Sequence, residues 1–228
     1  MATILQIETA TQVCSAALSV NGVTTFLKEQ AAQNIHAGSL TLFIDEVMKG
    51  AGMRYADLDA VAVSKGPGSY TGLRIGVSTA KGICFAIDKP LIGIDTLKMM
   101  ASGFLTINEN YTGLVCPMID ARRMEVFTAM YDTSLNEILP VTAKIIDDQS
   151  YITELTTNQV TFIGDGAMKC SESIVSANAV FSGANFNSAA HMSTLAAAAF
   201  DKQDFEELAY FEPYYLKDFV ITPSKKKV

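Results

Sequence analysis

The pattern of hydrophobic segments in the first half of the chain recurs in the second half, and this repeat limits the possible folds more than any other feature. Each half opens with three strand-like segments and then alternates helix and strand. The opening strands are predicted at residues 3–8, 14–20 and 23–28, and again at 113–119, 124–131 and 138–145. Hairpins give antiparallel pairs, whereas strands separated by a helix pair in parallel. The repeat therefore predicts two α/β lobes related by duplication.

The segments after these strands complete the two halves. In the first half they are a helix at 38–48, a strand at 58–64, a helix at 71–86, a strand at 90–94 and a helix at 96–105. In the second half they are a short helix at 149–156, a strand at 160–163 and helical stretches at 168–176 and 189–200. The lobes join between Phe104 and Tyr111, giving an N-terminal lobe of residues 1–104 and a C-terminal lobe of residues 105–228. The last helical segment is free to pack back on the first lobe.

The composition predicts a folded, acidic protein. Of the 228 residues, 49% are hydrophobic and 18% are charged, a balance that excludes a disordered chain. Seventeen Lys and Arg residues against 24 Asp and Glu residues leave a net charge of −7, which disfavours a protein that binds nucleic acid by itself. No apolar stretch approaches the ~20 residues of a membrane span, and no basic flank precedes the first one. We expect a cytoplasmic protein with no membrane partner.

Cysteine and histidine are too few and too scattered to indicate a metal or redox site. The residues are Cys14, Cys84, Cys116, Cys170, His36 and His191. The absence of CxxC, HExxH and GxSxG patterns argues against a disulfide framework, a zinc site and a serine nucleophile. We expect the cysteines to be small buried apolar residues and the histidines to be surface or packing residues.

A glycine-rich block, SKGPGSYTGLRIG at residues 64–76, joins a buried strand to a helix. Glycines allow close backbone approach and a helix N-terminus attracts anions, so a phosphate site is one interpretation. The other is a helix-cap loop, in which Gly66 and Gly68 form the turn and Ser69 or Thr71 caps the helix. The cap is favoured, because no lysine follows the last glycine and the glycine spacing does not fit a dinucleotide fingerprint.

Small residues recur at every fourth position on one face of the helix after this block. They are Gly72, Gly76, Ala80 and Cys84. Glycine inside a helix costs about 0.5 to 1 kcal/mol relative to alanine, so a close packing contact has to compensate for it. The face packs either inside its own lobe or against another chain. Because Leu73 and Val77 can already serve the core, both interpretations stay open.

Acidic residues close the first strand of each half, Glu8 in the first and Asp120 in the second. In two-lobed phosphotransferases such carboxylates bind Mg²⁺ or accept a proton. A candidate nucleotide cleft combines them with Thr9 and with the loop Gly164-Asp165-Gly166. The ordinary alternatives are solvated strand ends and, for the loop, a turn in which Asp165 caps the next helix. The turn is the favoured interpretation of the loop.

Two segments near the C-terminus have contrasting compositions. Residues 211–216, FEPYYL, are aromatic and are expected to anchor on a lobe. The last five residues include Lys225, Lys226 and Lys227 and lack apolar anchors, which predicts a frayed tail. Contact of this tail with RNA is the less favoured interpretation.

Three segments resemble the bacterial TsaB (YeaZ) family. They are ILQIETAT at 4–11 with CSAAL at 14–18, GPGSYTGLRIG at 66–76, and PYYL at 213–216. The central block is the specific one, and the first is shared with the wider actin-like ATPase superfamily. The resemblance implies two ribonuclease-H-like lobes in a small actin-like (ASKHA) α/β fold. It also implies a part in making threonylcarbamoyladenosine next to the tRNA anticodon, with a related catalytic subunit, TsaD, and a small ATPase, TsaE.

The same resemblance implies that this chain is not the catalyst. The catalytic relative carries a metal-binding HxxxH after the glycine block, and the matching positions here are Thr96 and Met100. The first loop reads Glu-Thr-Ala-Thr where many superfamily members have an aspartate and a glycine. We therefore expect a scaffold with no cofactor of its own, ATP or ADP with Mg²⁺ confined to the interface of the complex, and indirect contact with tRNA. Alone, the chain is expected to form a homodimer.

The expected partner surface lies on the N-terminal lobe, on the helix at 38–48 and the small-residue helix. The residues expected there are Leu40, Gly72, Gly76, Ala80 and Cys84. Two competing functions remain. One is an ATP-dependent phosphotransferase or ATPase that uses Glu8 and Asp120. The other is a glycoprotease-like metallopeptidase, for which the sequence offers neither a nucleophile nor a ligand cluster.

Overall fold

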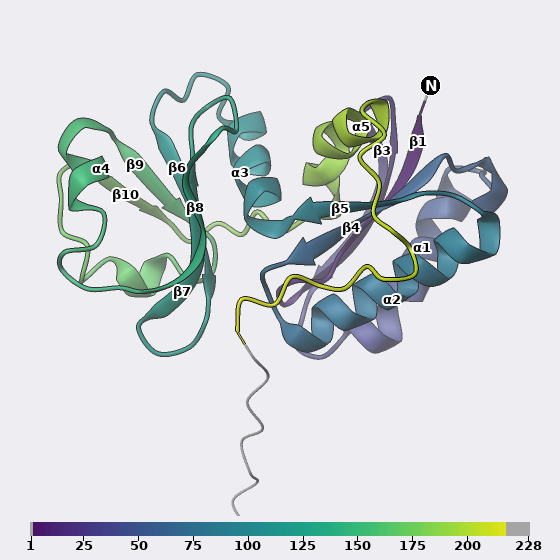
Figure 1. The fold of residues 1–228 in the computed structure, drawn as a ribbon, viewed down its shortest axis with the longest axis horizontal. Helices are drawn as coiled ribbons and strands as arrows, with labels where there is room; N and C mark the ends of the chain where they lie inside the picture. The colour runs from purple at the N-terminus through teal and green to yellow at the C-terminus, as the bar shows by residue number, and fades with distance from the viewer. Residues whose placement is uncertain (1, 218–228) are drawn as a thin grey trace, which may run out of the picture.

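The computed structural model describes residues 2–217, which form two α/β lobes (Figure 1). The first lobe contains β1 (Thr3–Glu8), β2 (Val13–Val20), β3 (Val23–Ala31), α1 (His36–Gly50), a 3₁₀ turn (Tyr55–Asp57), β4 (Ala60–Gly66), α2 (Tyr70–Ile87) and β5 (Leu91–Asp95). Its strands lie in the order β3-β2-β1-β4-β5. Neighbours among β1, β2 and β3 are antiparallel, while β4 runs parallel to β1 and β5 parallel to β4.

The opening meander forms as its sequence predicts. Asn21 and Gly22 join β2 to β3 with φ values of 51° and 77°, the left-handed pair that a two-residue hairpin turn requires. Strands β1 and β2 are buried almost throughout, whereas β3 at the edge of the sheet is mostly exposed. The alternation of apolar runs and turn residues is therefore sufficient to place these three strands.

The second lobe repeats the architecture of the first. It contains β6 (Leu114–Asp120), β7 (Glu125–Tyr131), β8 (Glu137–Ile145), α4 (Ile152–Thr157), β9 (Val160–Ile163) and β10 (Ala179–Ser182). The strand order is β10-β9-β6-β7-β8, and β6 pairs antiparallel with β7 and parallel with β9. Both sheets thus have the topology of a ribonuclease-H-like lobe, which confirms the predicted fold class.

The segment after β9 differs from the prediction of a helix at 168–176. Only a 3₁₀ turn forms, Met168–Cys170, and the chain then adds β10 parallel to β9. The Ser171 hydroxyl donates to the carbonyl of Met168 at 2.9 Å, and side-chain bonds of this kind compete with continuation of a helix. Val180 and Phe181 favour a strand because β-branched and aromatic side chains pack well on a sheet.

Helix α3 (Thr96–Ile107) lies between the two sheets and packs on both. Met100 and Phe104 are buried in one hydrophobic cluster with Ile94 from the first sheet and Ile119 from the second. A core that continues through both lobes holds them in one arrangement.

The chain returns to the first lobe after β10. A 3₁₀ turn at Ala189–Met192 leads into α5 (Ser193–Asp201), which packs beside β1, β3 and β5 (Figure 1). The side chains of Gln6 and Ser193 are hydrogen-bonded at 3.1 Å inside this contact. In the sequence, the first sheet precedes α3 and the second sheet follows it. Helix α5 comes after the second sheet but packs on the first.

Residues 205–217 run along the surface of the first lobe. The backbone N–H of Tyr214 donates to the carbonyl of Lys65 at 2.7 Å, and the rings of Tyr215 and Tyr70 lie 4.5 Å apart between centroids. The aromatic segment therefore anchors on a lobe as predicted, and the lysine-rich end of the chain lies outside the described residues. No helix within residues 2–217 has both the length and the hydropathy that a membrane span requires.

Candidate functional site

The turn between β1 and β2 lies directly against the glycine-rich block. A Cβ atom at Gly68 would lie 2.4 Å from the carbonyl oxygen of Ala10, and one at Gly72 would lie 2.0 Å from that of Thr9. A Cβ atom at Gly76 would lie 2.2 Å from the hydroxyl oxygen of Thr9. These separations are shorter than any real Cβ contact. The three glycines are therefore needed for the approach of the turn to the helix.

The loop before α2 is a helix cap, as the sequence favoured. The Ser69 hydroxyl accepts a hydrogen bond from the N–H of Gly72 at 3.3 Å, and the N–H of Ser69 donates to the carbonyl of Ala10 at 2.6 Å. Thr71, the other candidate cap, lies inside the helix with its side chain exposed. Because the chain itself fills the space in front of the glycines, the block is not open to a phosphate.

The small-residue face of α2 is buried in its own chain, so the expectation that a partner contacts it is wrong. The five residues assigned to the partner surface are all buried: Leu40, Gly72, Gly76, Ala80 and Cys84. The β1–β2 turn and strand β4 lie over this face, and Ala80 and Cys84 pack in the hydrophobic core of the lobe. A stripe of small residues predicts close packing, but it does not tell whether the same chain or another chain packs against it.

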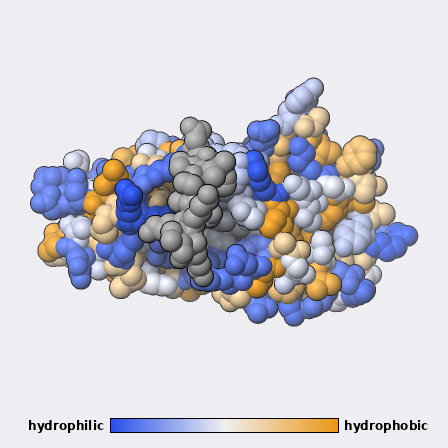
Figure 2. Space-filling model, turned by 90° about the horizontal axis from the view of Figure 1, so that it is seen from below, coloured by the Kyte–Doolittle hydropathy of each residue, from blue (hydrophilic) through white to orange (hydrophobic). Residues whose placement is uncertain are grey.

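The outer face of α2 carries the exposed apolar residues of this region. Phe85 is 83% exposed, and Leu42 on the neighbouring helix α1 is 60% exposed. Gly82 lies on the same side of α2, and a Cβ atom there would meet nothing within 4 Å. Figure 2, which views the first lobe from the side of α1 and α2, shows hydrophobic residues among polar ones on its right half. We call Leu42, Gly82 and Phe85 the outer face.

Glu8 is buried rather than exposed in a cleft, which neither sequence interpretation anticipated. One carboxylate oxygen accepts from the N–H of Ala10 at 2.6 Å, and the other has no hydrogen-bond partner among the described residues. The Thr9 hydroxyl is also buried without a partner there. Burial raises the pKa of Glu8 to about 7, and hydrogen bonds from Ala10 and Ser64 oppose this shift. The side chains of Glu8 and Thr9 are therefore both enclosed by the chain itself.

The other residues of the candidate nucleotide cleft form a separate group in the second lobe. Asp120 is exposed and forms an ion pair with Lys169. The Asp165 carboxylate accepts from the N–H of Asp120 at 3.0 Å, so it caps no helix, although the predicted turn does form. A Cβ atom at Gly164 would lie 2.5 Å from the Met100 side chain, and one at Gly166 would lie 3.0 Å from the N–H of Asp120. The hydrogen bonds of Glu8 and those of the Asp120 group join each to its own neighbours, so the nucleotide cleft assembled from the sequence stays a prediction.

The positions that align with metal ligands in the catalytic relative lie inside α3. Thr96 and Met100 are both fully buried, and the Thr96 hydroxyl has no hydrogen-bond partner among the described residues. The histidines are packing residues, since His36 Nε2 bonds to the carbonyl of Val13 at 3.1 Å and His191 Nδ1 to that of Phe186 at 2.8 Å. All four cysteines are buried and unpaired, as predicted. Residues 2–217 contain no cluster of three His, Cys, Asp or Glu side chains suited to a metal ion.

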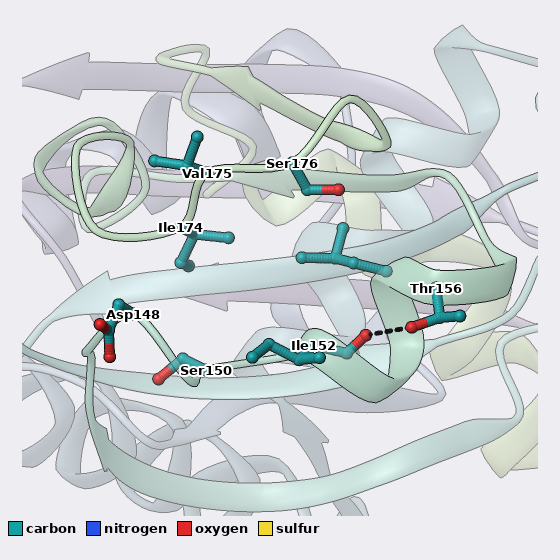
Figure 3. A pocket seen from close by; sticks show the side chains of 8 residues that line it. Asp148, Ser150, Ile152, Thr156, Ile174, Val175 and Ser176 are labelled. Atoms are coloured by element: carbon teal, nitrogen blue, oxygen red, sulfur yellow. Dashed lines mark hydrogen bonds between the residues drawn. The ribbon is translucent and has the colours of Figure 1, made fainter.

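Two surface hollows lie away from these residues. One, of about 240 Å³, lies between α4 and residues 174–176, where the side chains of Ile152, Ile174 and Val175 line it (Figure 3). The other, of about 400 Å³, lies between Lys65 and the returning segment at 206–214. Neither contains a residue of the candidate nucleotide cleft.

Comparison with known proteins gives matches along most of the chain. A family profile described as "TsaD: tRNA N6-adenosine threonylcarbamoyltransferase" matches residues 26–228. The chain is 37% identical to the tRNA threonylcarbamoyladenosine biosynthesis protein TsaB of Haemophilus influenzae over 125 residues, 55% of this chain and 52% of that protein. It is 36% identical to the TsaB protein of Escherichia coli over 135 residues, 59% and 57% of the two chains. The matches thus span a little over half the length of these curated relatives.

A solved structure shares the fold over nearly the whole chain. YeaZ from Pseudomonas aeruginosa superposes with a TM-score of 0.83 at 23% sequence identity, covering 95% of this chain and 100% of that one. At this identity the likeness concerns the fold, and it agrees with the two-lobed topology described above.

Two glycines of the same helix are expected to respond in opposite ways to alanine. Gly72→Ala forces a Cβ atom against the Thr9 carbonyl and should lower the free energy of unfolding by about 2 kcal/mol or more. Gly82→Ala meets open space and should raise it by about 0.5 to 1 kcal/mol. Urea denaturation of both variants measures the two changes. An equal loss of stability in both would contradict the proposed packing of the β1–β2 turn.

The burial of Glu8 predicts a stability that falls as pH rises. Its pKa is raised from 4.5 to about 7 in the folded protein, so the folded state binds this proton more tightly than the unfolded state. The stabilisation is complete below about pH 4.5 and is lost as the pH passes 7, an expected change of about 2 to 3 kcal/mol between pH 5 and 8. Denaturation curves of the natural protein and Glu8→Gln at both pH values test this. Parallel pH dependence in the two proteins would show that Glu8 is not the titrating group.

Proposed function

We propose, because the chain belongs to the TsaB (YeaZ) family, that it takes part in the threonylcarbamoyladenosine modification of tRNA next to the anticodon. In this proposal it is a non-catalytic subunit that holds a TsaD-like catalytic subunit in its active arrangement. It also completes the surface on which a TsaE-like ATPase docks. It has no cofactor of its own, and ATP or ADP with Mg²⁺ binds at the interface of the complex.

A non-catalytic role is supported by the surroundings of the residues that would otherwise react. Glu8 is enclosed in the first lobe, and Asp120 is paired with Lys169 in the second. Thr96 and Met100 offer a hydroxyl and a thioether that are both buried, and such groups are poor ligands for iron or zinc. The metallopeptidase alternative therefore lacks accessible ligands at these positions, and in the phosphotransferase alternative Asp120 is exposed but paired with Lys169 while Glu8 is enclosed.

The observation that carries the proposal is the outer face. Phe85 exposes 83% of its surface beside Gly82, whose missing side chain leaves the helix backbone open to close approach. Glycine in an exposed helix interior lowers stability and gains nothing within its own chain. An exposed aromatic residue beside such a glycine fits a helix of a second subunit packed closely against α2. We place the TsaD-like partner there, and a second copy of this chain when the partner is absent.

The outer face can be tested with variants that should leave the monomer folded. Gly82→Gln and Phe85→Gln should each weaken partner association at least about tenfold, because a long polar side chain blocks close helix packing. In the absence of the partner they should shift the chain from dimer to monomer in analytical ultracentrifugation. Val175→Gln, at an 86% exposed residue of the second lobe, is the matched control. Undiminished association of both outer-face variants would exclude this surface.

Reconstitution tests the proposed role itself. Threonylcarbamoylation of tRNA by the catalytic subunit and the small ATPase should require this chain, and the Glu8→Gln variant should support it as well as the natural protein does. Because Glu8 is enclosed in the free chain, we expect isothermal calorimetry of the isolated chain with Mg-ATP to show no binding. Loss of product formation with a folded Glu8→Gln variant, or tight nucleotide binding, would favour the phosphotransferase.

A further inference from the structure

A lysine of α2 holds the segment at residues 205–217 that runs along the first lobe. The Lys81 ammonium group donates to the carbonyl of Ala209 at 3.2 Å and to that of Phe211 at 3.0 Å. Within residues 2–217 this ammonium group forms no ion pair with a carboxylate. Charged donors make stronger hydrogen bonds than neutral ones, so Lys81 fixes the main chain on both sides of residue 210.

The main chain at this point directs its side chains to opposite sides. The backbone N–H groups of Tyr210 and Phe211 both donate to the carbonyl of Glu207, at 3.1 Å and 2.9 Å, which closes a turn. Leu208 and Phe211 pack against the hydrophobic core of the first lobe. The Tyr210 side chain, in contrast, is 79% exposed. The turn is therefore anchored by two apolar side chains and presents the tyrosine to solvent.

Tyr210 lies at the border of the outer face of α2. Phe85, which is 83% exposed, follows Lys81 by four residues and therefore projects from the same side of the helix. The Lys81 ammonium group bonds to the two carbonyls that flank Tyr210, so the tyrosine and Phe85 adjoin the same lysine. Within residues 2–217 no other aromatic side chain is as exposed as these two. Single exposed apolar side chains are common, whereas neighbouring ones mark interaction surfaces.

The segment continues to border α2 beyond Lys81. Towards the N-terminus of the helix, Arg74 Nε donates to the Tyr215 hydroxyl at 3.2 Å, and the ring of Tyr215 lies 4.5 Å from that of Tyr70 between centroids (Figure 1). Two packed helices have axes about 8 to 10 Å apart, and a helix with its side chains is about 10 to 12 Å across. A helix packed on the outer face is therefore wide enough to touch the segment that borders α2.

We propose, building on the proposed function, that Tyr210 contacts the partner helix that packs on the outer face, and that Lys81 is the positioning residue that holds Tyr210 there. A tyrosine ring gives a large contact area with only two rotatable bonds to fix. The main chain on both sides of the ring is already held in the free chain, so binding requires little further ordering. The partner that fits is a helix that packs closely on Gly82 and offers apolar side chains to both Phe85 and Tyr210.

Association of the full chain with the TsaD-like catalytic subunit, measured by isothermal calorimetry, tests both residues. Tyr210→Gln should weaken association at least about tenfold, because the ring is lost. Lys81→Met keeps an apolar stem and loses the ammonium group, and should weaken association about fivefold. Lys81→Arg, whose guanidinium group can donate to the same two carbonyls, should restore the affinity to within about twofold. Urea denaturation checks that each variant is folded.

A double variant separates a positioning role from a structural one. Lys81→Met combined with Tyr210→Gln should bind no more weakly than Tyr210→Gln alone, because a positioning residue acts only through the side chain that it holds. Losses that add up in the double variant would show that Lys81 acts in another way and would overturn its assigned role.

A matched control and the outer-face variants distinguish the possible failures. Ile145→Gln, at a residue of the second lobe that is 72% exposed, should change the affinity less than about twofold. Natural affinity in Tyr210→Gln together with weakened binding of Phe85→Gln would overturn this inference and leave the proposed function standing. Failure of the natural chain to associate with the catalytic subunit would overturn both.

Discussion

The contact between the β1–β2 turn and helix α2 is the constraint on which the first lobe depends. The carbonyl of Thr9 lies where a Cβ atom of residue 72 would be, so the helix can approach the sheet only because that residue is glycine. This approach buries the small-residue face, and a helix with one face fixed against a sheet has its opposite face fixed towards solvent. The exposure of Gly82 and Phe85 therefore results from an internal packing contact many residues away in sequence.

The elements that the sequence predicted best are those with strong local patterns. The meander was predictable because Asn21-Gly22 separates two apolar runs, and helix α2 because its apolar residues keep a helical period. The buried face of α2 was not predictable in the same way, since Gly72 and Gly82 look alike until Thr9 is known to lie against only one of them. Residues 168–176 were mistaken for a helix because their apolar spacing does not show that the chain stops at a 3₁₀ turn, beyond which the Ser171 hydroxyl bonds to the Met168 carbonyl.

The two strand-end carboxylates show how the halves of a duplicated fold diverge. Glu8 and Asp120 close equivalent strands, yet one is enclosed with a pKa raised to about 7 while the other is exposed and paired with a lysine. The difference arises from the segment that covers each strand end. In the first lobe the glycine-rich block folds over the strand end, whereas in the second the chain turns at Arg122 and leaves the strand end open. An acidic residue at a strand end therefore has no fixed role in this topology.

The two lobes also differ in the residues that they expose at their surfaces. In the first lobe, α2 presents an apolar outer face around Phe85, and in the second lobe the hairpin at Arg122 presents cations. Net charge conceals the cations of this hairpin, because residues 105–192, which include the second sheet, hold four Lys and Arg residues against ten Asp and Glu residues. Helix α3 packs on both sheets, so the apolar face and the cationic turn are held at a fixed separation. A rigid body that holds two unlike surfaces apart can make a contact at each of them without crowding one contact against the other.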